Sequence, residues 1–479
     1  MPQTPTDEER WSQAAAWSRS THLNELETTM WRSERHPEQS STIAALLILD
    51  RAPEAERLAA AHAWAAELVP RVRQRVVEPL LPTGPPAWVN DNDFDLGYHL
   101  RRQLIWPGSE RKALLGMVRT LLLTPFDRRR PLWEATLIEG LAGGRAAYLL
   151  KAHHSLADGV GMIQLLSGLN SRTRGHIADK PVTAATDPVW QQTVSPWEVT
   201  VDGVSAFVRA AVDASPDVLG GLAGAVLNPV AALSASQRYL ASFRRTVIPP
   251  DAGTQSPLLR RRTGRSWSLR YLDCSLAELR AAGKAAGGSI NDAYLAALLG
   301  GLRRYHERHD VVVDDIPITV PVSLRGASDP LGGNKFAGAV LPGPVGVVDP
   351  VERIAQVRGL MLAATTEPAL DAFSVMAPLV NRLPSVVGST AMRLGARNDL
   401  AASNVPGIRE QVYLAGARVE QTIPFGPLPG VAMMAVMTSY VERCSIGLTL
   451  DSAAFPDADV LESCCAEGLE EVLAVGRPL

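Results

Sequence analysis

A buried strand followed by an amphipathic helix occurs twice in this chain of 479 residues, and the repetition limits the folds that the chain can adopt. The first pair is an apolar run over residues 41–50 and a helical pattern over residues 54–69. The second pair is an alternating segment that begins near Ser266 and a helical pattern over residues 276–284. A chain of this length is too long for one compact core, so we expect two domains of similar α/β make-up with a cleft between them.

A β-hairpin is the clearest element of the first half. Residues 133–139 alternate as in a strand, the glycine-rich residues 140–144 are typical of a turn, and residues 145–152 return as a second strand. With the turn centred in that segment, cross-strand pairing places Pro131 and Trp133 beside the end of the returning strand. The hairpin therefore places the residues that follow residue 152 at one end of the first sheet.

The middle of the chain reads as a crossing between the two lobes. Between about residues 170 and 265 the sequence is rich in Ala, Thr, Pro and Ser, and proline-containing dipeptides interrupt it. We therefore predict a first lobe over residues 1–172, a helical crossing over residues 173–265 and a second lobe over residues 266–479. Further strands are predicted over residues 315–322, 336–341, 431–439 and 445–451, with a closing helix over residues 459–474.

Composition excludes several classes of partner. The 47 basic residues nearly cancel the 50 acidic residues, so no overall positive field is available to gather nucleic acid.

The four cysteines show no CxxC spacing, and the adjacent Cys464 and Cys465 are typical of a buried helix. The N-terminus lacks the pattern of a secretory signal, and no apolar stretch is long enough for a bilayer. We expect a cytoplasmic protein, which could meet the inner membrane face or lipid droplets through an amphipathic region over residues 204–245.

Two adjacent histidines end the hairpin. His153 and His154 are followed by Asp158 and Gly159, which precede an apolar helix. A neutral imidazole can take a proton from a hydroxyl at physiological pH, so one histidine is a candidate general base. Neighbouring residues of a strand point to opposite faces, so the other histidine is expected to pack inside. Asp158 could hold the site in place, but an Asp before a helix is also a common N-cap. The spacing does not match a zinc site, so we expect no bound metal.

The motifs resemble those of a known family. His153, His154, Asp158 and Gly159 match the HHxxxDG signature of the coenzyme A-dependent acyltransferases, which include chloramphenicol acetyltransferases, carnitine acyltransferases and the condensation domains of peptide synthetases. The rest of the chain resembles the bacterial wax ester synthase/diacylglycerol acyltransferase family. Pro131, Leu132, Trp133 and Glu134 match the PLWE motif of that family, and Asn291 and Asp292 match its ND motif. Further family motifs are matched in family order at residues 321–325, at Gly333 and Asn334, at residues 403–407 and at Ser439 and Tyr440.

This resemblance implies a fold and roles for particular residues. The fold has two similar lobes, each a mixed sheet flanked by helices, with a tunnel between them. His154 is the implied general base, with His153 beside it, and Asp158 is implied to pair with a downstream arginine, for which Arg325 is the candidate. Support of the site is implied for Gly159, Arg325, Asn291 and Asp292, and substrate contacts for Pro131, Leu132, Trp133, Glu134, Asn334, Ser403, Asn404 and Ser439.

Some of these residues have a structural alternative. Residues 289–292 read as a capping box, in which Ser289 caps a helix and Asp292 folds back to it. Trp133 could equally be a core residue. Family members often carry an Asp near the N-terminus, but residues 23–27 contain no clear equivalent, so no role is assigned there.

The implied reaction moves a long-chain acyl group from acyl-CoA to diacylglycerol or a long-chain alcohol and gives triacylglycerol or wax ester. Acyl-CoA is the cosubstrate, and no bound cofactor is implied. Backbone amides near Gly159 or a hydroxyl such as that of Ser439 could donate to the oxyanion. Two alternatives remain: an acyltransferase for a specialised metabolite or for a carrier-protein-bound donor, and a non-catalytic protein that binds lipid surfaces. The intact His154 and Asp158 argue against the non-catalytic protein.

Overall fold

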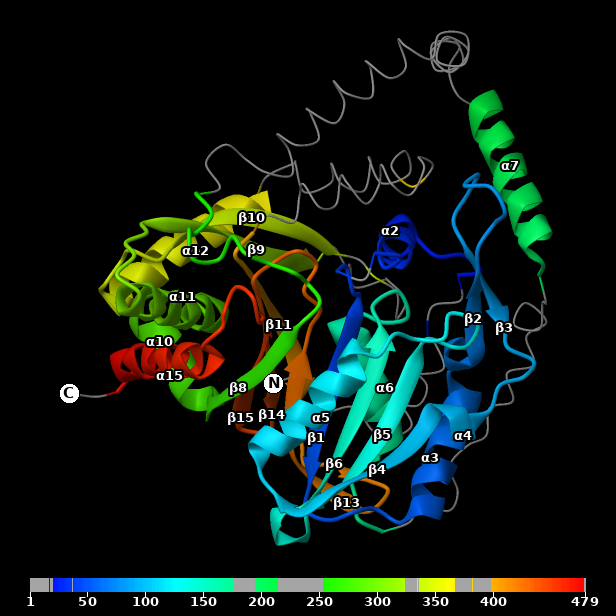
Figure 1. Ribbon diagram of the computed structural model, residues 1–479, viewed down its shortest axis with the longest axis horizontal. Coiled ribbons are helices and arrows are strands. Elements are labelled where there is room, and N and C mark those ends of the chain that lie inside the picture. Colours follow the sequence, from blue (N-terminus) through cyan, green and yellow to red (C-terminus); the bar gives the residue numbers. More distant parts are fainter. Residues whose placement is uncertain are drawn as a thin grey trace.

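A computed structural model describes most of the chain, namely residues 17, 20–36, 38–175, 194–213, 253–323, 334, 336–366, 381 and 398–477. Within these residues the chain forms a seven-stranded sheet, a six-stranded sheet and a two-stranded hairpin, with helices packed around the two larger sheets (Figure 1). The expected fold class, two mixed sheets flanked by helices, is confirmed.

The first sheet carries the predicted hairpin. Its strands are, in spatial order, β4 (Leu100–Ser109), β5 (Trp133–Leu141), β6 (Ala146–His153), β1 (Thr42–Leu49), β13 (Ala417–Phe425), β12 (Tyr413–Leu414) and β7 (Asn170–Ser171). The predicted strands over residues 41–50, 133–139 and 145–152 are therefore confirmed as β1, β5 and β6. Strand β1 is buried at every residue and is paired on both edges, which explains its unbroken apolar run.

The two faces of β1 belong to different cores. One face packs into the interior of the first lobe, and its residues are Ile43, Ala45, Leu47 and Leu49. The other face packs into a core that also contains residues of the second sheet, such as Trp267 and Ala401, and its residues are Ala44, Leu46 and Ile48. Strand β1 therefore stands between the first lobe's own core and a core that joins the two lobes.

The second sheet is mixed. Its strands are, in spatial order, β10 (Phe336–Pro344), β9 (Asp315–Ser323), β11 (Leu400–Ile408), β14 (Met433–Tyr440), β15 (Arg443–Asp451) and β8 (Trp267–Ser275). Strand β11 runs parallel to β9 and β14, and the other pairs are antiparallel. Five of these strands were predicted. Strand β11 was not, because Pro406 and Gly407 break its pattern.

Helices cover the outer faces of both sheets. The second sheet is covered on the outside by α10 (Leu276–Ala285), α11 (Ile290–Arg308), α12 (Pro350–Thr366) and α15 (Ala458–Val475) (Figure 1). The first half contains α2 (Glu25–Ser33), α3 (Ala55–Leu68), α4 (Leu96–His99), α5 (Arg111–Leu123) and α6 (Gly159–Leu169), followed by α7 (Pro196–Asp213). The two-stranded hairpin is formed by β2 (Gln74–Val77) and β3 (Ala87–Asn90). The predicted helices over residues 54–69, 276–284 and 459–474 are confirmed, and all four cysteines are free thiols.

The sheets do not follow the order of the chain. Strands β12 and β13 lie in the C-terminal half of the sequence, yet β13 pairs with β1 of the first sheet, with Leu46 opposite Ile423. Strand β13 covers the edge of β1 that would otherwise expose unpaired backbone groups, and β12 joins β13 to β7. The division into residues 1–172, 173–265 and 266–479 stays a prediction. Residues 413–425 belong to the third of these parts in the sequence, but their strands β12 and β13 complete the sheet of the first part. Much of the predicted crossing lies outside the described residues.

Among the residues that the structure describes, no helix is both long and apolar enough to cross a membrane.

Candidate active site

The hairpin brings the two histidines to the junction of the sheets. Trp133 pairs with Ala152, as the turn predicted, and the backbone N–H of His153 donates to the carbonyl of Leu132 at 2.9 Å. The N–H of His154 donates to the carbonyl of Ser41 at 2.7 Å, just before β1 begins. Backbone hydrogen bonds to the residues just before β5 and β1 therefore fix the start of the loop that follows His154.

His153 is the histidine that packs inside. Its side chain is fully buried, and its Nε2 lies 3.0 Å from Oε2 of Glu34. The N–H of Ser155 donates to its Nδ1 at 3.0 Å, so the ring proton sits on Nε2 and faces the carboxylate. The ring also meets Trp31 edge to face, with centroids 5.8 Å apart. The expectation that one histidine of the pair turns away is confirmed.

His154 faces the opposite way and is held by Asn334. Asn334 Nδ2 donates to the His154 carbonyl at 2.6 Å, so its Oδ1, which lies 2.8 Å from His154 Nδ1, must be the acceptor. The proton therefore sits on Nδ1, and Nε2 is the basic nitrogen. Burial lowers the pKa of His154, while the charge of Asp158 and the hydrogen bond to Asn334 oppose that shift. The imidazole is thus neutral at neutral pH, as a general base must be.

Asn334 is itself held by helix α2. Its N–H and its Nδ2 lie 3.0 and 3.4 Å from Oε1 of Glu27, and Asn24 Nδ2 donates to its carbonyl at 3.0 Å. Glu27 is buried, and this burial raises its pKa. No role was predicted for Asn24 or Glu27 from the sequence, although they form the capping box of α2, which their spacing could have revealed.

A cavity of about 70 Å³ lies between the two sheets beside His154. It is mostly apolar, and its lining comes from β1, α6, β11, β13 and β14: Ile43, Ala44, Ala45, His154, Gly159, Met162, Ile163, Ser403, Val405, Thr422, Pro424, Phe425, Gly426, Pro427, Met434, Val436 and Thr438. Three hydroxyl groups interrupt the apolar wall. One of them, Oγ1 of Thr438, is buried and forms no hydrogen bond with a described residue.

Asp158 and Gly159 start helix α6. Oδ1 of Asp158 accepts a hydrogen bond from the N–H of Gly161 at 2.7 Å, which confirms the N-cap interpretation. A Cβ on Gly159 would lie 2.6 Å from Cγ2 of Val405, so only glycine lets α6 approach β11 this closely. The implied partner of Asp158, Arg325, lies outside the described residues.

The PLWE residues lie behind the site. Pro131 and Leu132 are buried, and the Trp133 indole N–H donates to the carbonyl of Val72 at 2.7 Å. Glu134 lies 3.4 Å from Lys151 Nζ in a buried ion pair. Trp133 is a core residue, and none of the four lines the cavity of His154. Their contact with substrate stays a prediction.

Some of the remaining motif residues line the cavity, and others only support the fold around it. Asn291 and Asp292 begin α11, where Ser289 and Asp292 form the expected capping box with distances of 2.7 and 3.2 Å. Ser403 lines the cavity, whereas the neighbouring Asn404 is exposed. The lining also includes Thr438 but not Ser439. No group of side chains that could hold a metal ion occurs in the described part of the chain.

These features define a class of protein: two joined mixed sheets with a histidine-bearing loop and an Asp-Gly helix start at their junction, as in coenzyme A-dependent acyltransferases. Solved structures with this fold include the wax ester synthase/diacylglycerol acyltransferase of Marinobacter aquaeolei VT8, with a TM-score of 0.66, 22% identity, and coverage of 95% of this chain and 100% of that one. The first condensation domain of the calcium-dependent antibiotic synthetase has a TM-score of 0.58 at 16% identity and covers 95% of this chain and 96% of that one.

Sequence comparison is more specific. Residues 23–294 match the wax ester synthase/diacylglycerol acyltransferase catalytic domain, and residues 332–472 match the C-terminal domain of the same family. A Mycobacterium tuberculosis protein assigned as a diacylglycerol O-acyltransferase is 39% identical over 462 residues, which are 95% of this chain and 92% of that protein. The chain belongs to the wax ester synthase/diacylglycerol acyltransferase family. It is an O-acyltransferase, and the resemblance noted in its sequence is confirmed.

Proposed function

We propose that this enzyme transfers a long-chain acyl group from acyl-CoA to diacylglycerol or a long-chain alcohol, with His154 as the general base. The observation that carries the proposal is the position of His154 at an apolar cavity between the sheets, with the Nδ1 proton hydrogen-bonded to Asn334, so that Nε2 is the unprotonated nitrogen. An apolar lining suits a long aliphatic acceptor. The names of the relatives support the same pair of acceptors.

The reaction needs no covalent enzyme intermediate. Nε2 of His154 removes the hydroxyl proton of the acceptor as its oxygen attacks the thioester carbonyl, and the new C–O bond leaves a tetrahedral oxyanion. Collapse of the oxyanion breaks the C–S bond, and the released thiolate of coenzyme A takes the proton from His154. The hydroxyl of Thr438, buried in the cavity wall, is the proposed donor to the oxyanion.

Substitution of each histidine tests the assignment of the base. His154→Ala should lower turnover by about 100- to 10,000-fold, the usual effect of losing a general base. His153→Ala should act mainly on stability, since the ring is buried against Glu34 and Trp31. Turnover with palmitoyl-CoA and a melting curve are measured for both variants. A folded His154→Ala enzyme with near-normal turnover would contradict the mechanism.

The acceptor is tested with a panel of alcohols. Specificity constants are compared for hexadecanol, dioleoylglycerol, butanol and a sugar alcohol, each with palmitoyl-CoA. Each buried methylene contributes about 0.8 kcal/mol, so the two long-chain acceptors should exceed butanol by several powers of ten. A preference for the sugar alcohol would contradict the proposed lipid acceptor but not the proposed acyltransferase chemistry. Replacing palmitoyl-CoA by palmitoyl-carrier protein separates the two classes of donor.

We also propose that the enzyme works at a lipid surface. Helix α7 exposes Trp197, Val201 and Val204 on one face, with exposed fractions of 63%, 45% and 43%. The loop between β2 and β3 adds the exposed Leu80 and Leu81 and is tied to α7 by the Leu80 N–H, which donates to Thr200 Oγ1 at 2.8 Å. Flotation with dioleoylglycerol-containing vesicles should fall on Trp197→Ser and stay unchanged on Trp106→Ser, which alters an exposed tryptophan on β4. Equal flotation of the two variants would argue against this surface.

A further inference from the structure

Two cysteines lie directly opposite each other at the edge of the second sheet. Cys274 is on β8, the last strand in the order of that sheet, and the antiparallel register pairs it with Cys444 on β15. Directly opposed residues of antiparallel strands have Cα atoms about 4.5 or about 5.5 Å apart, and a disulfide joins Cα atoms about 4.4–6.8 Å apart. The backbone therefore holds the two cysteines at a separation that a disulfide can span, while both are free thiols.

The two cysteine side chains point to the same face of the sheet. Cys444 belongs to the core beneath the outer helices, and Cys274 packs against that core. The next opposed pair, Asp273 and Ser445, meets on the other face, where the Ser445 hydroxyl donates to Oδ1 of Asp273 at 2.8 Å. A disulfide between the cysteines therefore needs no change of register and no turning of either strand.

The two thiols differ in acidity. A hydrogen bond from the Cys274 thiol lowers the pKa of Cys444, burial opposes that shift, and the positive charge of Arg280 on α10 supports it. The same hydrogen bond raises the pKa of Cys274, and burial raises it further. Because the thiolate is the nucleophilic form, Cys444 is the nucleophile of the pair and Cys274 is the second thiol. Cys274 is only partly buried, so solvent reaches the pair.

The other two cysteines have a different setting. Cys464 and Cys465 are adjacent on helix α15 and are both buried. Neighbouring residues of a helix do not face each other, so these two thiols are not placed to pair. Burial also raises the pKa of both, which keeps them in the unreactive thiol form. They provide an internal control for the opposed pair.

We propose that Cys274 and Cys444 are a reversible oxidation site, at which hydrogen peroxide forms a disulfide that ties β8 to β15. The Cys444 thiolate attacks one oxygen of the peroxide, which breaks the O–O bond and gives a sulfenic acid and hydroxide. The Cys274 sulfur then attacks the sulfenic sulfur, the S–S bond forms, and the S–O bond breaks as the oxygen leaves with the Cys274 proton as water. The hydroxide takes the proton that Cys444 released. Two thiols and one peroxide thus give one disulfide and two waters, and a thiol reductant restores the thiols.

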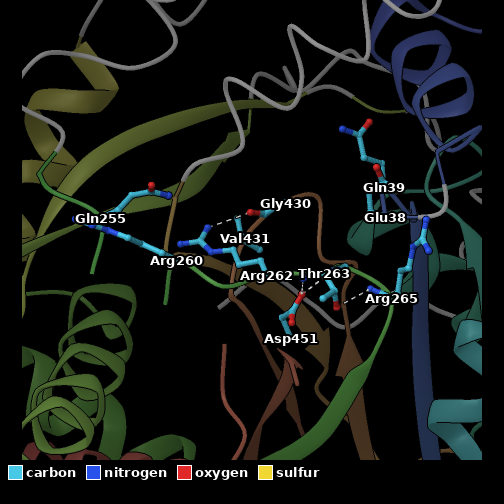
Figure 2. A pocket seen from close by; sticks show the side chains of 11 residues that line it. Glu38, Gln39, Gln255, Arg260, Arg262, Thr263, Arg265, Gly430, Val431 and Asp451 are labelled. Atoms are coloured by element: carbon cyan, nitrogen blue, oxygen red, sulfur yellow. Dashed lines mark hydrogen bonds between the residues drawn. The ribbon is translucent and has the colours of Figure 1, made fainter. Parts of the chain in front are cut away.

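The expected effect of this bond is on stability. Neither thiol lines the cavity of His154 or the cavity of about 600 Å³ that Figure 2 shows beside Arg262 and Asp451. The loop between the two cysteines contains most of the second lobe, and closing a long loop restricts the unfolded chain. The bond would also hold the edge strand β8 in the sheet. The inference does not depend on the proposed function.

Mass spectrometry of the full chain tests the site. After treatment with an equal amount of hydrogen peroxide, the intact mass should fall by two hydrogen atoms, and a peptide with Cys274 should be linked to a peptide with Cys444. A thiol reductant should reverse both changes. Cys464→Ala/Cys465→Ala is the matched control and should form the same link. A chain that forms no link, or one that links Cys464 or Cys465 instead, would overturn the proposal.

Two further measurements test the order of the steps and the effect of the bond. Cys274→Ser removes the second thiol, so peroxide should add oxygen atoms to Cys444 in place of removing hydrogen. Oxidation of the unmodified chain should raise its melting temperature by several degrees and leave kcat and KM for palmitoyl-CoA unchanged, whereas Cys274→Ser/Cys444→Ala should show no rise. A Cys444 that stays a thiol in Cys274→Ser would contradict its role as the nucleophile. Equal melting temperatures of the reduced and oxidised chains would refute a stabilising bond.

Discussion

His153 and His154 are adjacent in the chain, yet their neighbours give the two imidazoles opposite tautomers. The N–H of Ser155 donates to Nδ1 of His153, whereas Nδ1 of His154 donates to Asn334. The first ring is therefore a buried support that faces Glu34, and the second presents a basic nitrogen to the cavity. At this scale a hydrogen bond to a distant residue, Asn334, sets the tautomer of His154.

Asp158 offers a test of the electrostatics at His154. Its charge raises the pKa of His154 against the lowering by burial, so Asp158→Asn should lower that pKa further. Because the proposed general base is the neutral ring, the acidic limb of the kcat/KM profile should move to lower pH. Asn still caps helices well, so the cap of α6 should be kept, whereas Asp158→Ala should also lose the cap, at about 1 kcal/mol. An acidic limb that does not move in Asp158→Asn would show that the carboxylate has no effect on His154.

Thr438 tests the proposed oxyanion donor. Thr438→Val keeps the shape of the side chain and removes the hydroxyl, which forms no hydrogen bond with a described residue. We expect kcat to fall by about 100- to 1,000-fold, as for loss of one oxyanion donor, with KM and the melting temperature nearly unchanged. Thr438→Ser should keep most of the activity. Full activity of the valine variant would assign the oxyanion to other donors.

At the scale of elements, glycines mark two close approaches around the cavity, one between the lobes and one within the second sheet. Gly159 lets the start of α6 meet Val405 on β11, and Gly407 lets β11 pass Ser439, whose carbonyl oxygen would lie 1.5 Å from an added Cβ. Gly159 belongs to the motif that contains the candidate base His154, and Gly407 to the motif that contains the candidate substrate contacts Ser403 and Asn404. Their physical role is to bring α6, β11 and β14 together around the cavity of His154.

Gly159→Ala tests this contact. The added methyl group would meet Val405, so we expect a loss of about 1–3 kcal/mol in unfolding free energy together with lower turnover. Val405→Ala in the same chain should restore part of both, which a double-mutant cycle measures. Gly168→Ala on the same helix is the control, because its Cβ would have no atom within 4 Å. Equal effects of the two alanines would mean that the contact with β11 is unimportant.

At the scale of the whole molecule, the two sheets are parts of one structure. The chain leaves the second sheet after β11, adds β12 and β13 to the first, and returns as β14. The returning strands pack tightly on the exchanged segment, since a Cβ on Gly447 would lie 1.7 Å from the carbonyl oxygen of Pro424. Neither sheet can lose its order without removing strands or contacts from the other.

We therefore expect one cooperative unfolding transition for the full chain in calorimetry, although its length is that of two domains. Gly447→Ala should lower the temperature of that single transition, because the methyl group would push β15 away from Pro424. Gly359→Ala, on the surface helix α12, has no atom within 4 Å of its Cβ and should leave the transition in place. Two separate transitions in the unmodified chain would show that the exchange does not couple the lobes.

Local patterns were sufficient for much of the fold. Strand β1, the hairpin of β5 and β6, and helices α3, α10 and α15 were predicted because each element follows from side-chain periodicity or turn composition over a few residues. The caps at Asp158 and Ser289 were visible for the same reason. Strands β11 and β13 were not predicted. Proline and glycine break the alternating pattern of β11, and β13 depends on pairing with β1, which is distant in the sequence.

The sequence by itself determined the class of fold, the family and the pair of histidines. It could not determine that Glu27 holds Asn334, that Thr438 and not Ser439 lines the cavity, or that the PLWE residues lie behind the site. Those facts depend on contacts between residues far apart in the chain, such as Glu27 and Asn334, which are 307 positions apart. A local pattern fixes which face of an element a side chain occupies, and only the packing of elements from both lobes fixes what that face meets.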